Sequence, residues 1–199
     1  LILPRRAEVA AVAAGGQDSV GLRCPSHPVA QAVLRAAATH GVHGVAAPSA
    51  NRFGRVSPTS AAPVMEEVAA LADDALLVLD GGACPVGIES TIVDCTRGHP
   101  VLLRPGVLTP ARLEAIAGQP LRARDGAAPR ASGTLESHYA PRAKVRLMDA
   151  RQLRAAFQVL GEDARHIALY ARSPIEAARG APRRRMPDDA EAAARELFA

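Results

Sequence analysis

The sequence has few aromatic side chains and almost no lysine. Only 3% of its 199 residues are aromatic and none is tryptophan, so aliphatic side chains and alanine must fill any core. This scarcity disfavours an RNA-binding module, because such modules stack bases on aromatic platforms. The formal net charge is +4, and Lys144 is the only lysine. A mildly basic balance suits an anionic ligand but does not by itself indicate nucleic-acid binding.

Cysteine and long apolar runs are also scarce. Cys24, Cys84 and Cys95 are odd in number and lack C-x-x-C spacing, which argues against a zinc site or a disulfide framework and favours a reducing compartment. The longest apolar runs, such as Ala75 to Leu79, are far shorter than the ~20 residues that a bilayer span needs. No signal peptide is evident. We therefore expect a cytoplasmic protein that has no membrane segment and no metal site of its own.

Several common catalytic signatures are missing. There is no P-loop, no G-x-G-x-x-G and no H-E-x-x-H pattern, and no Ser-His-Asp or Cys-His constellation. The chain begins with Leu1 rather than Met and stops at Ala199 within a helical pattern that no Gly or Asn closes. We therefore expect the sequence to be part of a longer protein.

Apolar periodicity predicts an alternation of short strands and helices. Helical spacing and capping residues predict helices over 28–39, from 57–60 to about 71, over 109–118, over 149–161 and from 187 onward. Short apolar runs predict strands at 19–23, 42–47, 76–79, 90–94, 101–104, 144–148 and 166–170. Because several neighbouring strands are separated only by turns, we expect a mixed, twisted α/β sheet with helices rather than a pure βαβ series.

The predicted elements fall into two units. Residues 119–142 are rich in Pro, Gly, Ala, Ser and Arg without a sustained period, which is typical of a linker. We expect a first domain over 1–118, a linker over 119–143, and the beginning of a small doubly wound α/β domain over 144–199.

Polar side chains follow several predicted strands. Pro48-Ser49-Ala50-Asn51 follows an apolar run, where α/β sheets bind ligands, although an ordinary polar turn would look the same. The small residues and hydroxyls of 87–91 could approach a ligand or form a bulge. Arg104, before a Pro-Gly turn, could clamp a phosphate, and Arg23 could bind a carboxylate. Surface arginines are commoner, and either residue could be one.

The predicted linker contains a His and an aromatic residue, within Ser137-His138-Tyr139-Ala140-Pro141. A linker that crosses the active crevice would explain them, with Tyr139 packing on a nucleotide. Otherwise the segment is a hinge.

Together, in this order and spacing, the motifs closely resemble the YrdC-like threonylcarbamoyl-AMP synthases. The resemblance covers residues 1 to about 142, and the unit after the linker resembles the start of the extra C-terminal domain in the longer form of that family. The segments that carry it are Val20-Gly21-Leu22-Arg23-Cys24-Pro25, Ala47-Pro48-Ser49-Ala50-Asn51, Ser57-Pro58-Thr59, Glu89-Ser90-Thr91-Ile92-Val93-Asp94, Leu103-Arg104-Pro105-Gly106 and Ser137-His138-Tyr139-Ala140-Pro141.

The resemblance implies a nucleotidyltransferase that joins L-threonine, bicarbonate and ATP into threonylcarbamoyl-adenylate and pyrophosphate. Magnesium would accompany the nucleotide, and a partner transferase would pass the group to an adenosine of tRNA. The linker would lie over the active site. The residues that the resemblance assigns to threonine are Arg23, Ala47 and Ser90, and those that it assigns to ATP are Ser19, Ser49, Asn51, Ser57, Arg104 and Tyr139, with Asn51 bracing the loop.

One departure from the family bears on activity. Its threonine-contacting loop and its phosphate-gripping Lys-x-Arg motif would lie before Leu1, and Lys144 stands in a different context. We expect this chain alone to be inactive or nearly so.

Two alternative functions remain open. One is a carbamoyl-transfer domain from hydrogenase maturation, which the linker motif and the following domain do not fit. The other is a non-catalytic RNA-binding module, favoured by the charge, whose only dense basic stripe would be Arg183 to Arg185. A weak RNA contact is compatible with either an enzyme or such a module.

Overall fold

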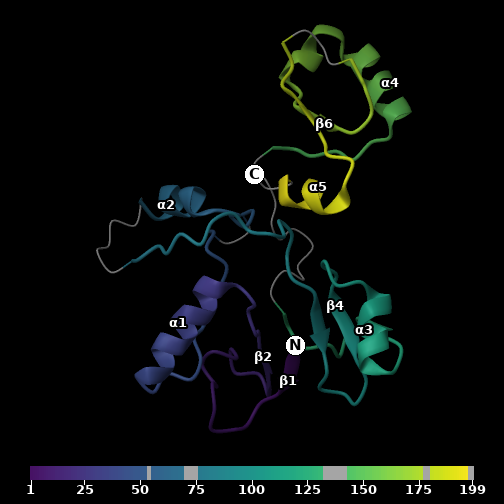
Figure 1. Ribbon diagram of the computed structural model, residues 1–199. Coiled ribbons are helices and arrows are strands. Elements are labelled where there is room, and N and C mark those ends of the chain that lie inside the picture. Colours follow the sequence, from purple (N-terminus) through teal and green to yellow (C-terminus); the bar gives the residue numbers. More distant parts are fainter. Residues whose placement is uncertain (53–54, 70–75, 132–142, 177–179, 197–199) are drawn as a thin grey trace.

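The first part of the chain forms a five-stranded sheet (Figure 1). The computed structural model describes residues 1–52, 55–69, 76–131, 143–176 and 180–196. Strand order is β2-β1-β3-β4-β5; β1–β3 and β4–β5 are parallel, whereas β1–β2 and β3–β4 are antiparallel. The predicted mixed α/β sheet is therefore confirmed. The strands are β1 (Ile2–Pro4), β2 (Ser19–Gly21), β3 (Ile92–Asp94), β4 (Val101–Arg104) and β5 (Arg122–Ala123).

A small aliphatic core lies on this sheet. Ile2, Val101 and Leu103 are buried together, and Ile92 packs against them. Ala128 and Ala131 pack on the same cluster. Part of the segment expected to be a linker therefore adds both a strand, β5, and core contacts to the sheet. Its apolar side chains leave water only by packing on residues that are distant in sequence.

Three helices accompany the sheet: α1 (Pro28–Thr39), α2 (Ala61–Ala69) and α3 (Pro110–Ala117). The Thr109 side chain accepts a hydrogen bond from the Arg112 N–H at 3.4 Å, and Gly118 ends α3 in the left-handed conformation, with φ of 67°. These are the cap and stop that the sequence predicted. Figure 1 shows α3 directly beside β4.

The second part of the chain contains α4 (Ala150–Leu160), the 3-10 helix η1 (Gly161–His166), β6 (Leu169–Ala171), β7 (Arg183–Arg185) and α5 (Ala190–Glu196). Asp149 and Gln152 cap α4 reciprocally, because each side chain accepts a hydrogen bond from the backbone N–H of the other residue, at 2.8 and 3.0 Å. β6 and β7 pair in parallel. None of the helices among the described residues is long and apolar enough to cross a bilayer.

Three predicted strands do not form. Residues 42–47, 76–79 and 144–148 are irregular, and Val45 and Leu77 are exposed. The predicted strand at 166–170 begins only at Leu169, after η1 ends at His166. An extended apolar run becomes a strand only where a neighbouring strand pairs with its backbone N–H and C=O groups. No strand in the described part of the chain pairs with these three runs.

Candidate active site

The candidate site lies where β3 begins and β4 ends. The two strands are antiparallel and Ile92 pairs with Arg104, so the residues before β3 lie beside those that follow β4. Gly106 passes close to this segment: a Cβ atom there would lie 2.7 Å from both the carbonyl oxygen of Glu89 and the Thr91 Oγ1. Only glycine allows this approach without displacing the backbone.

Arg104 is the centre of the site. Its Nε donates to the backbone oxygen of Ser90 at 2.9 Å, and its Nη2 donates to the Ser90 Oγ at 3.1 Å. The same Nη2 lies 3.3 Å from the Glu89 Oε2. Arg104 is only 9% exposed. A buried guanidinium needs such partners, and here they fix the direction in which its fork points.

The network extends from Glu89 to the loop after residue 47. The Ser57 Oγ donates to the Glu89 Oε1 at 2.5 Å and lies 3.3 Å from the Asn51 Oδ1. The Asn51 amide donates to the backbone oxygens of Arg52 and Arg55, both at 3.0 Å. Asn51, Ser57, Ser90 and Arg104, four of the residues predicted for the site, therefore belong to one hydrogen-bonded group.

Arg23 and Ala47, two of the residues assigned to threonine, also meet. The Arg23 Nη2 donates a hydrogen bond to the Ala47 backbone oxygen. Both residues are exposed. A second link joins nearby loops, since the Cys84 N–H donates to the Thr59 oxygen at 2.7 Å. The loop after β2 is thus joined to the loop after α1. The loop before α2 is joined to the loop after it.

The remaining predicted residues are less closely tied to this network. Ser19 is half-buried in β2, where it pairs with Pro4 of β1. Ser49 is exposed in the loop after Ala47. Tyr139 and the rest of its motif lie outside the described residues.

The sequence interpretation gave no role to Glu89, which joins the two halves of the network. It is the only charged residue between Gly81 and Val93. The sequence does offer a signal for this role. Glu89 is a lone carboxylate immediately before a predicted strand, and it is next to Ser90, which was already assigned to a ligand.

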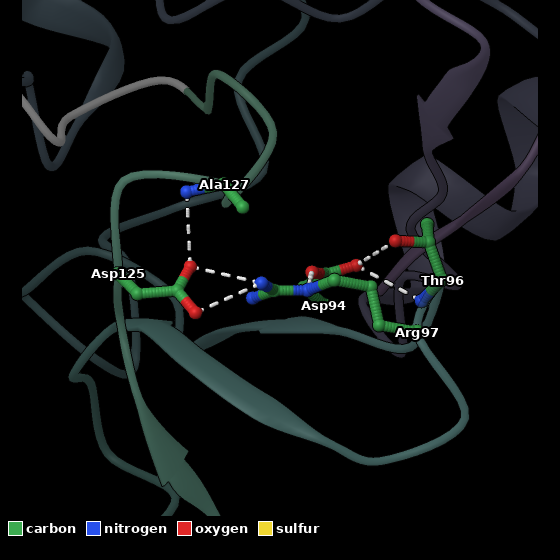
Figure 2. Close-up of polar contacts among 5 residues, drawn as sticks. All are labelled: Asp94, Thr96, Arg97, Asp125 and Ala127. Atoms are coloured by element: carbon green, nitrogen blue, oxygen red, sulfur yellow. Dashed lines mark hydrogen bonds and ion pairs between the residues drawn. The ribbon is translucent and has the colours of Figure 1, made fainter.

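A second polar cluster lies at the opposite end of β3 (Figure 2). Asp94 is fully buried and accepts hydrogen bonds from the Thr96 N–H and Oγ1, at 2.9 and 2.7 Å, and from the Arg97 Nε at 3.2 Å. The Arg97 Nη1 contacts both carboxylate oxygens of Asp125, at 2.8 and 3.0 Å. The hydrogen bond from Arg97 lowers the pKa of Asp125. This cluster joins the β3–β4 turn to the segment after β5, so we interpret it as structural.

The geometry suits binding and charge stabilisation more than nucleophilic attack. The network offers an oriented cation, hydroxyls and an amide, which can hold anionic groups in place. In the part of the chain that the structure describes, no three His, Cys, Asp or Glu side chains gather as a metal site.

Comparison with known proteins accounts for both parts of the chain. A family model described as "Telomere recombination", which covers the Sua5, YciO and YrdC proteins, matches residues 1–106. A model of the C-terminal domain of threonylcarbamoyl-AMP synthase matches residues 108–199.

Individual relatives agree with these models. Threonylcarbamoyl-AMP synthase from Pyrococcus abyssi is 36% identical over 150 residues, which is 73% of this chain and 42% of that protein. The enzyme of the same name from Bacillus subtilis is 37% identical over 140 residues, 67% of this chain and 38% of that protein. This chain therefore spans about two-fifths of the length of these relatives.

A solved structure agrees as well. The crystal structure of P. abyssi Sua5 complexed with L-threonine superposes with a TM-score of 0.79 at 30% identity, covering 99% of this chain and 58% of that one. From the two family models, the relatives and this superposition, we conclude that the chain belongs to the YrdC-like threonylcarbamoyl-AMP synthases, in the longer form that carries an additional C-terminal domain.

Proposed function

We propose that the protein is an L-threonylcarbamoyladenylate synthase, which forms threonylcarbamoyl-AMP and pyrophosphate from L-threonine, bicarbonate and ATP for tRNA modification. The observation that carries the proposal is the network around Arg104, in which this buried cation and Glu89 together link residues of three separate motif segments. The relatives named threonylcarbamoyl-AMP synthase support it, as does the threonine bound to the P. abyssi structure.

The chemistry asks the protein for positioning more than for a nucleophile. The threonine amino group and bicarbonate give a carbamate with loss of water, and a carbamate oxygen then attacks the α-phosphorus while pyrophosphate leaves. Oriented donors and a cation stabilise the charge that builds up on the phosphate. Arg104, whose Nε and Nη2 are held by Ser90 and Glu89, is suited to that role.

We assign one group of residues to threonine and another to ATP. Arg23, Ala47 and Ser90 would bind threonine, with Arg23 taking its carboxylate. Magnesium would enter with the triphosphate, since it is commonly held by substrate phosphates and few protein ligands. The residues proposed for ATP are Ser19, Ser49, Asn51, Ser57, Arg104 and Tyr139.

The remaining assignments follow from the same function. Residues 119–143 would connect a domain over 1–118 to one over 144–199, and their later part would cover the site. A downstream transferase would receive the threonylcarbamoyl group, and the reaction would take place in the cytoplasm.

Titration calorimetry on this chain tests the proposal. ATP and L-threonine should each bind, and RNA should not compete with them. Salt-sensitive binding of RNA without binding of either substrate would instead support a non-catalytic RNA-binding module. Arg104→Lys should weaken ATP binding, because an ammonium cannot reproduce the forked contacts of the guanidinium.

A further inference from the structure

Glu89 joins two ligand-binding candidates that come from distant parts of the sequence. One carboxylate oxygen accepts from the Ser57 hydroxyl at 2.5 Å, and the other lies 3.3 Å from the Arg104 Nη2. The Glu89 side chain is 25% exposed and that of Arg104 is 11% exposed, so both are largely shielded from water. In such surroundings hydrogen bonds to charged groups are among the stronger ones.

The network also decides whether the Ser57 hydroxyl can donate a hydrogen bond to a ligand or only accept one. A serine hydroxyl has a single proton to donate. Both polar neighbours of the Ser57 Oγ in this network, the Glu89 Oε1 at 2.5 Å and the Asn51 Oδ1 at 3.3 Å, are acceptors. The proton is therefore used within the network, and Ser57 can offer a ligand only its lone pairs. A phosphate oxygen, which is itself an acceptor, does not fit that position.

We propose that Glu89 is a positioning residue that makes Ser57 an acceptor for a ribose hydroxyl of ATP while holding the Arg104 guanidinium toward the phosphates. The inference rests on the proposed function and deepens it. Ser57 and Arg104 are separated by the span of one carboxylate. Within ATP, the donors that lie this near the phosphates are the ribose hydroxyls, whereas the adenine amino group is at the far end of the nucleotide.

The test compares ATP with 2′-deoxyATP and 3′-deoxyATP by titration calorimetry. For the unmodified chain, one of the two analogues should bind about tenfold more weakly than ATP, the effect of losing one hydrogen bond in a shielded site. Ser57→Ala should remove this difference between ATP and its analogue. Glu89→Gln leaves a single acceptor oxygen for two donors, the Ser57 hydroxyl and the Arg104 Nη2, so it should weaken ATP binding.

Glu89→Ala completes the comparison. With the carboxylate gone, Ser57 and Arg104 both lose the acceptor that they share, so the affinity for ATP should fall. Asp188→Asn removes one carboxylate from the exposed Arg185–Asp188 pair and serves as the charge-matched control, with unchanged binding expected. Circular dichroism establishes that each variant is folded.

Two results would overturn the inference: equal binding of ATP and both analogues by the unmodified chain, or a difference that persists in Ser57→Ala. If the unmodified chain binds neither ATP nor threonine, the proposed function fails for this chain. A measurement without ligand then tests separately whether Glu89 positions Arg104. Proton exchange of the Arg104 Nε–H, followed by NMR, should be faster in Glu89→Ala than in the unmodified chain. Equal exchange rates would show that Glu89 does not position Arg104.

Discussion

The backbone of Gly87 lies against the carbonyl oxygen of Ala194 and the Cα of Arg195. A Cβ atom at residue 87 would also lie 2.8 Å from the carbonyl carbon of Arg195. Helix α5 therefore packs directly on the segment that leads into Glu89 and Ser90. The atoms in the way are backbone atoms, which cannot move aside as a flexible side chain can.

Gly87→Ala should loosen α5. The added methyl group overlaps the helix backbone, and overpacking of this kind costs about 1–3 kcal/mol. Hydrogen exchange of the amides of residues 190–196 should therefore become faster. Gly126→Ala is the control, because no atom lies within 4 Å of a Cβ placed there and its φ is not positive. Equal exchange in the two variants would contradict the packing described.

Gly106→Ala should disturb the site itself. The new Cβ would overlap the Thr91 backbone nitrogen and lie 2.7 Å from the Glu89 oxygen, pushing the end of β4 away from residues 89–91. We expect destabilisation of about 1–3 kcal/mol in denaturant unfolding, together with weaker ATP binding. Gly44→Ala, where a Cβ meets no atom within 4 Å, should change neither property. Unchanged unfolding of Gly106→Ala would argue against this close approach.

The Arg97–Asp125 ion pair should make stability depend on acid pH. Arg97 lowers the pKa of Asp125 below its ordinary value of 3.8, so the unfolded chain binds this proton more readily than the folded chain. The stabilisation is therefore fully present above that ordinary value and is lost as the pH falls through the lowered one. Because Asp125 is 60% exposed, we expect a small effect that salt weakens further.

Asp125→Asn isolates this contribution. Denaturant unfolding between pH 7 and pH 3 should show a shallower loss of stability on the acid side for the variant than for the unmodified chain. Asp188→Asn again provides the matched control and should retain the full slope. An identical slope in all three proteins would show that the pair does not contribute.

Glu196 should control the ionisation of Tyr170. Burial raises the pKa of this phenol, and the charge of Glu196, which lies 3.5 Å from the hydroxyl, raises it further. Glu196→Gln should lower the pKa toward its ordinary value of 10.0. Ultraviolet titration of tyrosinate measures the shift, in a Tyr139→Phe background because the sequence has two tyrosines.

The same pKa shift affects stability at alkaline pH. The folded chain keeps the Tyr170 proton more tightly than the unfolded chain, so the stabilisation is complete below the ordinary pKa and disappears as the pH rises through the raised one. Glu196→Gln should reduce this alkaline loss. An unaltered titration curve would contradict the contact between α5 and β6.

The elements that sequence reasoning predicted well depend on neighbouring residues. Thr109, Pro110 and Gly118 bound α3, and Asp149 with Gln152 starts α4, because caps act within one helical turn. The wrong predictions were strands. Residues 42–47 and 76–79 have the composition of strands, but pairing needs a partner that composition does not provide.

The candidate site was likewise predicted from the sequence only in part. The motif segments predicted Asn51, Ser57, Ser90 and Arg104, and the structure places these four in one network. The assignments of all these residues, and of Arg23, Ala47, Ser19, Ser49 and Tyr139, to threonine or ATP stay predictions.

The sequence by itself determined the family, the mixed α/β class and most helix boundaries, since each depends on residue types at short or ordered spacing. Only the tertiary structure decided that Glu89 lies between Ser57 and Arg104, and that α5 packs on Gly87. The separations along the chain are 32 residues between Ser57 and Glu89, and more than 100 between Gly87 and α5. Contacts over such separations depend on how the whole chain packs, which no local pattern encodes.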